Sequence, residues 1–197
     1  MSGLHPAIGL LEFSSIARGV EAGDAMVKRS PVDAIYAGTV HPGKFIVLVG
    51  GLTASVEEAM EAGQLVGSGA IVAEVLLPDV HPAVITALRG VRVPSAAEAI
   101  GVVETSNIAP SIAAADAAMK AAAVELLELR LADDIGGRGY AVVGGTVADV
   151  EVAVAAGVAA IKPDDVVASV VIPQAHDDLI ANLDGHARFG DRTRQQL

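Results

Sequence analysis

The stretch Ile8–Lys28, IGLLEFSSIARGVEAGDAMVK, is written a second time as Ile100–Lys120, IGVVETSNIAPSIAAADAAMK. Identical residues stand 92 positions apart in the two copies, among them the pairs Ile8 and Ile100, Gly9 and Gly101, Glu12 and Glu104, Ile16 and Ile108, Asp24 and Asp116, and Lys28 and Lys120. The correspondence continues further along, where Gly50-Gly51 recurs as Gly144-Gly145 and the Pro78/His81 pair recurs as Pro173/His176. A repeat of roughly 90 residues is much longer than a solenoid unit and predicts two small domains, each with its own core.

The repeat sets the expected domain boundaries. We assign residues 1–92 to the first domain, with its core at 7–89, and residues 93–183 to the second domain. Residues 184–197, DGHARFGDRTRQQL, form a polar stretch that we expect to be a flexible tail, with a docking peptide as the other interpretation.

Composition narrows the class of protein. Hydrophobic residues make up 52% of the chain but aromatic residues only 3%, so the core must be built from Val, Ile, Leu and Ala. This composition suggests apolar surface buried in an assembly, with a compact alanine-rich monomer as the other interpretation. The start, MSGLHPAIG, does not resemble a signal peptide and no apolar run approaches 18 residues, so we expect a cytoplasmic protein with no membrane partner. The net charge of -11 argues against nucleic acid as a partner, and the absence of cysteine excludes disulfides.

Hydrophobic patterning predicts the same order of elements in both copies: strand, helix, two strands, helix, strand and a short helix. This is the order of an α+β, ferredoxin-like (split βαβ) domain. In the first copy we expect strands 8–13, 33–40, 44–49 and 70–77, a first helix that ends near residue 29, and helices 55–66 and 81–88. In the second copy we expect strands 100–105, 124–132, 140–143 and 166–172, a first helix that ends near residue 121, and helices 149–160 and 176–183.

Three local features of the helices follow from the same patterns. Ile16, Val20 and Val27 share one face of the first helix, and Ser55 with Glu58 resembles a capping box that opens the second. Asp24/Lys28 and Asp116/Lys120 are spaced as ordinary exposed i,i+4 pairs, which stabilise a helix little.

No catalytic constellation is present in the sequence. It contains no H-E-x-x-H, no P-loop and no dinucleotide-binding glycine pattern in the right context, so we do not expect an enzyme. Gly136–Gly139, GGRG, could hold an anion through backbone N–H groups, but a turn between strands explains it as well, and we favour the turn.

Comparison of the two copies also separates the histidines present in both copies from His41, which has no histidine counterpart. His81 and His176 occupy equivalent positions before the short helices, which favours a structural role for both. His41 lies in the strand-to-strand loop TVHPGKF, and the matching loop of the second copy, ADDIGGRGY, has Asp133-Asp134 and no histidine.

These residues together resemble the shell proteins of bacterial microcompartments, in particular the tandem-domain class and its propanediol-utilisation type. The likeness rests on the opening strand with Gly9 and Glu12, the segments DAMVK and ADAAMK that end at Lys28 and Lys120, and VIPQAH at Val171–His176. The resemblance implies a homotrimer with a pseudohexameric outline. It places residues of both loops at a central pore, namely His41, Pro42, Gly43, Asp133, Asp134, Ile135, Gly136 and Gly137, and it places Lys28, Lys120, Asp79 and Gln174 at tile edges.

Two departures from the family pattern matter. Members of this type carry a cysteine in the loop before P-G-K-F that holds an iron-sulfur cluster on the threefold axis; here the position is His41, so we do not expect that cluster. Three His41 side chains on the axis could hold a metal ion or could simply line the pore. Single-domain relatives often have an edge arginine where this chain has Asp79 and Gln174, so flat tiling is less assured than trimer formation.

The leading hypothesis is a structural shell protein, a homotrimeric facet tile whose pore passes small metabolites. By the resemblance, its partners are other copies of itself, other microcompartment shell proteins and encapsulated enzymes. The alternative hypothesis is a trimeric regulator that binds a small molecule through the same fold.

Overall fold

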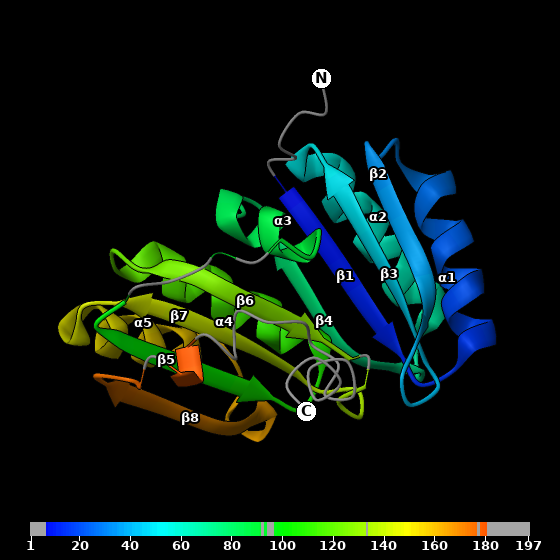
Figure 1. The fold of residues 1–197 in the computed structure, drawn as a ribbon. Coiled ribbons are helices and arrows are strands. Elements are labelled where there is room, and N and C mark those ends of the chain that lie inside the picture. Colours follow the sequence, from blue (N-terminus) through cyan, green and yellow to red (C-terminus); the bar gives the residue numbers. More distant parts are fainter. Residues whose placement is uncertain (1–6, 92, 94–96, 133, 177, 181–197) are drawn as a thin grey trace.

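The computed structural model describes residues 7–91, 93, 97–132, 134–176 and 178–180 and contains two four-stranded sheets, each with its own pair of long helices (Figure 1). The predicted tail, 184–197, lies outside the described residues. In the described part of the chain, no helix is long and apolar enough to cross a membrane. The elements of the first domain are β1 (Ala7–Phe13), α1 (Ile16–Arg29), β2 (Ala34–Val40), β3 (Lys44–Gly51), α2 (Thr53–Gly67), β4 (Ile71–Leu77) and α3 (Pro82–Leu88).

The second domain repeats this order. Its elements are β5 (Ala99–Thr105), α4 (Ile108–Ala121), β6 (Glu125–Leu131), β7 (Gly139–Gly145), α5 (Val147–Ala159), a single 3-10 turn at Pro163–Asp165 and β8 (Val166–Pro173). Residues 178–180 are helical, which matches the described part of the short helix expected over 176–183.

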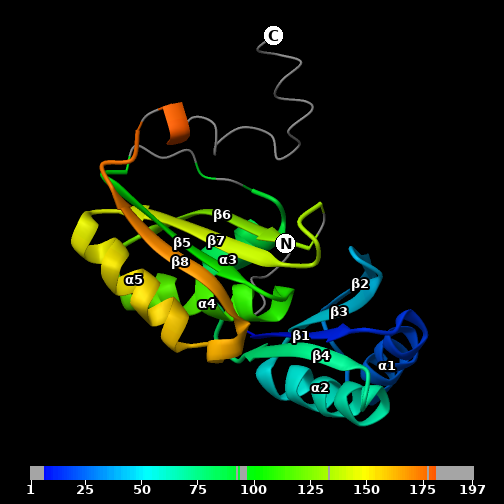
Figure 2. The same cartoon turned by 90° about the horizontal axis from the view of Figure 1, so that it is seen from below.

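The strand order confirms the predicted ferredoxin-like fold. It is β2-β3-β1-β4 in the first sheet and β6-β7-β5-β8 in the second, with every pair antiparallel. In each domain two helices cover one face of the sheet, α1 and α2 in the first and α4 and α5 in the second (Figure 2).

Two predicted helix starts were wrong. No side chain caps α2, which begins at Thr53 after Leu52, so Ser55 and Glu58 lie inside the helix and form no capping box. Helix α5 begins at Val147 instead of Asp149 because the Thr146 hydroxyl accepts the Asp149 backbone N–H at 3.2 Å and acts as the N-cap.

The repeated glycine of the opening strands sets how closely helix and sheet approach. A Cβ on Gly9 would lie 2.6 Å from Cγ of Met60, and one on Gly101 would lie 2.4 Å from Cγ2 of Val154. Helix α2 therefore packs directly on the backbone of β1, and α5 on that of β5. A larger residue in place of either glycine would force the helix away from the strand.

The buried face of helix α1 is made mainly of small residues. Gly19, Ala22, Gly23 and Met26 are buried, whereas the predicted apolar face of Ile16, Val20 and Val27 is exposed. The apolar periodicity of this helix therefore does not mark the domain core.

The two domains share buried structure. Helix α4 packs against β4 and β1 of the first domain, and α3 packs against β6 of the second. One apolar cluster accordingly spans both domains, while a second, which includes Phe13 and Met26, belongs to the first domain alone. The expectation of a separate core for each domain therefore holds in part. A small third cluster of Ile100, Leu127 and Val142 belongs to the second domain alone. The larger cluster is shared, because α4 is alanine-rich and is buried on two sides.

Candidate pore loops and domain joint

The two loops predicted to line a pore lie side by side in the chain. A Cβ on Gly137 would lie 2.6 Å from Cδ of Pro42 and 2.8 Å from the carbonyl oxygen of His41. The first loop joins β2 to β3 and the second joins β6 to β7, so the fold brings together residues about 95 positions apart. Asp133 lies outside the described residues.

The second loop closes on itself through left-handed backbone. Asp134, Gly136 and Gly137 all have positive φ, at 65, 69 and 79°. The carbonyl of Ala132 accepts the N–H groups of Ile135 and Gly137, both at 3.2 Å. Because the Gly137 N–H is used inside the loop, the glycine-rich stretch acts as a turn between strands, and it is not a nest for an anion.

Metal ligation at His41 would require other copies of the chain. Among the described residues there is no cluster of three or more His, Cys, Asp or Glu side chains that could hold a metal ion. The chain also has no cysteine, so the donor set at this loop does not fit an iron-sulfur cluster.

Asp116 and Lys120 form part of the joint between the domains. The Asp116 carboxylate is buried, accepts the backbone N–H of His81 at 2.7 Å and pairs with Nζ of Lys120 at 2.6 Å. Lys120 also donates to the backbone carbonyl of Asp79. The expectation of an exposed pair was therefore wrong here, because the neighbouring domain covers the carboxylate.

The matching pair in the first domain follows the expectation. Lys28 and Asp24 are exposed and lie 2.6 Å apart. Gln174, the counterpart of Asp79, is also exposed, has a φ of 53° and donates its backbone N–H to the carbonyl of Glu98 at 2.8 Å. All four predicted edge residues are thus exposed in the described protomer, and two of them, Lys120 and Asp79, also contact each other.

The two repeated histidines have the same local role. Nδ1 of His81 accepts the backbone N–H of Ala83, and Nδ1 of His176 accepts that of Asp178, both at 3.2 Å. Each imidazole caps the short helix that follows it, which agrees with the structural role expected from the repeat.

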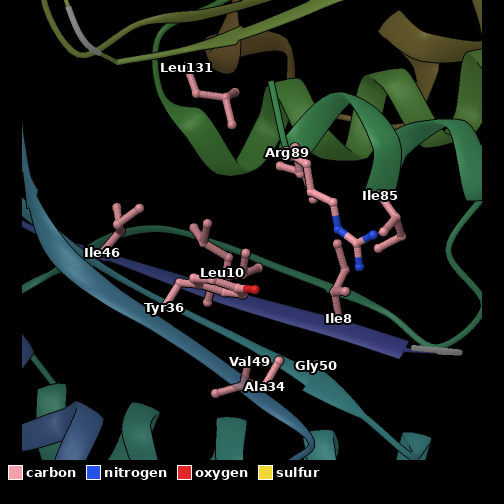
Figure 3. Close-up of a pocket in the computed structure, with 12 residues that line it drawn as sticks. Ile8, Leu10, Ala34, Tyr36, Ile46, Val49, Gly50, Ile85, Arg89 and Leu131 are labelled. Atoms are coloured by element: carbon pink, nitrogen blue, oxygen red, sulfur yellow. The ribbon is translucent and has the colours of Figure 1, made fainter. Parts of the chain in front are cut away.

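An apolar pocket of about 300 Å³ lies between the open face of the first sheet, α3 and the second domain (Figure 3). Sequence reasoning missed it because its lining comes from separate segments, mostly β1, β2, β3 and the α3 region of the first domain, with Leu131 of the second. The side chains of Tyr36 and Arg89 bring the hydroxyl and the guanidinium to an otherwise apolar lining that includes Ile8, Leu10, Ile46, Ile85 and Leu131.

Comparison with known proteins identifies the family. The family model described as BMC domain matches residues 7–80 and again 99–175, so the chain belongs to the BMC-domain family, with two copies of the domain. It is 40% identical over 177 residues to the bacterial microcompartment shell protein PduT of Citrobacter freundii, covering 89% of this chain and 96% of that protein.

Solved structures agree with this assignment. A microcompartment protein from Desulfitobacterium hafniense DCB is 44% identical, with a TM-score of 0.76, over 88% of this chain and 97% of its own. The fused permuted hexameric shell protein of the RMM microcompartment is 22% identical, with a TM-score of 0.55 over 90% of this chain and 85% of its own, which shows the fold alone.

The family membership confirms the functional class that the resemblance implied. The chain is a bacterial microcompartment shell protein, a structural component and not an enzyme. The regulator hypothesis is not favoured, since the matching proteins are shell proteins.

Proposed function

We propose that this chain forms a homotrimeric, pseudohexagonal facet tile whose central pore is lined by the β2–β3 and β6–β7 loops. The observation that supports this most strongly is a mismatch in burial between equivalent residues of the two copies. Residues that lie in the joint within the chain are buried, and their counterparts outside it are exposed.

The mismatch appears on both sides of the joint. On the first-domain side, Val84 of α3 is 0% exposed and its counterpart Leu179 is 43% exposed. On the second-domain side, Ile112 of α4 is 0% exposed and its counterpart Val20 is 54% exposed. Exposed apolar residues at these positions form two faces that match the two halves of an interface already made within the chain.

Because each face corresponds to one half of the joint within the chain, the two faces point to contact with a second copy of the chain. Helix α1 of one copy would pack against β8, β5 and the 178–180 segment of the next, as α4 packs against β4, β1 and α3 within the chain. Such a contact is head-to-tail, so it closes into a ring if the rotation is right. Three chains with two domains each would give six similar joints.

The pore follows from the same ring. His41, Pro42 and Gly43 of one domain and the Asp134–Gly137 loop of the other would alternate around the axis, together with Asp133 from the sequence. We propose that His41 lines the pore as a polar side chain for small metabolites. A trigonal imidazole site for a metal ion is the competing arrangement at the same position.

Assembly into a shell would use the tile edges. We propose that Lys28, Lys120, Asp79 and Gln174 lie near the contacts with other shell proteins, and that enzymes are enclosed behind the tile. Lys120 and Asp79 already contact each other across the domain joint, which fixes their positions before tiles meet.

Native mass spectrometry of the untagged protein tests the trimer directly. Three copies of the chain are expected over a wide dilution range. A monomer at all concentrations would overturn the proposal. Co-expression with single-domain shell proteins then tests the shell role, where the expected result is closed shells that contain this chain, and shells that always lack it would contradict the role.

A further inference from the structure

A buried carboxylate of the first domain caps a helix of the second. Glu12 on β1 is 0% exposed, and its Oε2 accepts the backbone N–H of Ile108, the first residue of α4, at 3.0 Å. The residue at the N-cap position, Asn107, makes no side-chain capping bond of its own. The negative charge of Glu12 therefore lies where the helix dipole stabilises it.

A lysine completes this polar joint. Nζ of Lys44 donates to Oε1 of Glu12 at 2.8 Å and to Oδ1 of Asn107 at 2.6 Å. The buried carboxylate is thus paired as well as hydrogen-bonded, which makes its burial tolerable. Four groups from the two domains form one connected unit.

The second domain carries the counterpart of the carboxylate that accepts the helix N–H, together with a basic partner for it. Glu104 is the counterpart of Glu12 and Arg138 that of Lys44, and the two pair at 2.7 Å. The Glu104 side chain, however, is 33% exposed. Arg138 thus holds the Glu104 carboxylate in place, but within the described residues no helix N–H donates to it.

The counterpart of the capped helix start, which donates the backbone N–H, is also present, at the start of α1. Ser15 and Ile16 are the counterparts of Asn107 and Ile108. The Ser15 hydroxyl accepts the Arg18 N–H at 3.4 Å, and within the described residues no carboxylate reaches the Ile16 N–H.

We propose that Glu104 of one copy caps α1 of the next copy by accepting the Ile16 N–H, with Arg138 donating to the Ser15 hydroxyl. This inference rests on the proposed trimer and names the groups that set its register. The two substitutions between the copies offset each other in length. Ser15 is shorter than its counterpart Asn107, and Arg138 reaches further than its counterpart Lys44. The cap also ties the subunit joint to the pore, since Arg138 directly follows the loop residue Gly137.

A double-mutant cycle with a backbone probe tests the cap. Glu104→Ala removes the carboxylate, and Ile16→Pro removes the N–H that it would accept, while Ile16→Ala controls for the lost isoleucine side chain. Proline is tolerated at the first position of a helix, and the extended backbone of Ser15, with φ of -124° and ψ of 122°, suits a residue before proline.

The measurement is the monomer–trimer dissociation constant of each variant by native mass spectrometry and sedimentation, with the circular dichroism spectrum of each variant as a check on folding. We expect Glu104→Ala to weaken the trimer at least tenfold in the Ile16→Ala background and less than threefold in the Ile16→Pro background. A ratio of the two effects below threefold would overturn the cap. A wild-type protein that is monomeric throughout would refute the trimer itself, so the two failures are distinguishable.

Discussion

The backbone N–H of His81 donates to the carboxylate of Asp116 at 2.7 Å, from the first domain to the second. Both residues have a copy elsewhere in the chain, at His176 and Asp24, and those copies lie in the two regions that we propose to meet between subunits. A single chain therefore contains one complete contact between its domains, and it also contains the residues that could form both sides of a second, similar contact with other copies.

Removing the Asp116 carboxylate is expected to destabilise the fold. Asp116→Ala leaves the His81 N–H and the Lys120 ammonium without their shared acceptor, and we expect the free energy of unfolding to fall by about 1 to 3 kcal/mol. Urea denaturation of the variant and the wild type measures the difference.

The control is an exposed ion pair of the same chemistry. Glu58 and Arg29 lie 3.7 Å apart and both are largely exposed, so Glu58→Gln is expected to change the free energy of unfolding by about 0.5 kcal/mol or less. Equal effects of the two substitutions would show that Asp116 has no special part in the joint.

The contact between the two loops can be tested at adjacent glycines. Both Gly136 and Gly137 have positive φ, but a Cβ on Gly136 would meet nothing within 4 Å, whereas one on Gly137 would meet Pro42 and the His41 carbonyl. We expect Gly136→Ala to cost about 1 to 2 kcal/mol from backbone strain alone. Gly137→Ala should cost roughly 1 to 3 kcal/mol more because the His41 loop must move.

Thermal and denaturant unfolding of the two variants provide the measurement. If the two alanines destabilise the protein equally, the loops are not in contact in solution.

The exposed face of α1 should carry the subunit interface. Val20→Asp places a charge where the proposal buries an apolar side chain, and we expect the trimer to dissociate at concentrations where the wild type stays associated. Val152→Asp is the matched control, because Val152 is also about half exposed but its counterpart, Glu58, is exposed as well and lies outside the in-chain joint.

Analytical ultracentrifugation of both variants over a dilution series gives the result. Dissociation in both variants, or in neither, would mean that α1 is not the contact surface.

His41 is expected to line the pore without binding metal. Wild-type protein and His41→Ala should therefore show the same zinc content after equilibrium dialysis, and both should remain trimers. If one zinc ion were bound to each wild-type trimer and none to the variant, His41 would form a metal site on the axis and would not simply line the pore.

The order of elements and the fold were predictable because each copy carries a complete pattern. Strands β1 and β5 and helices α1 and α4 follow from the repeated opening stretch, and the repeat itself makes each assignment twice. A structural role for His81 and His176 was predictable for the same reason, because both precede equivalent short helices; the structure added that each accepts an N–H at the start of its helix.

The faces of the helices were less predictable. Ile16, Val20 and Val27 give α1 an apolar stripe, yet the sheet takes up the glycine and alanine face instead. Periodicity shows that one side of a helix avoids water, but it does not show which surface covers that side. Ser55 and Glu58 failed as a capping box because the turn after Gly51 starts the helix earlier.

The sequence by itself determined the duplication, the α+β domain type and the class of protein, because these depend on local patterns and on residue identities that recur. Only the tertiary structure decided which copy of each repeated residue is buried. Glu12 and Glu104 are the same residue in the same strand position, but the first lies under the N-terminus of α4 and the second faces outward. The difference arises because two domains in one chain form a single contact with each other. The burial of the equivalent residues on the other faces then depends on neighbouring molecules.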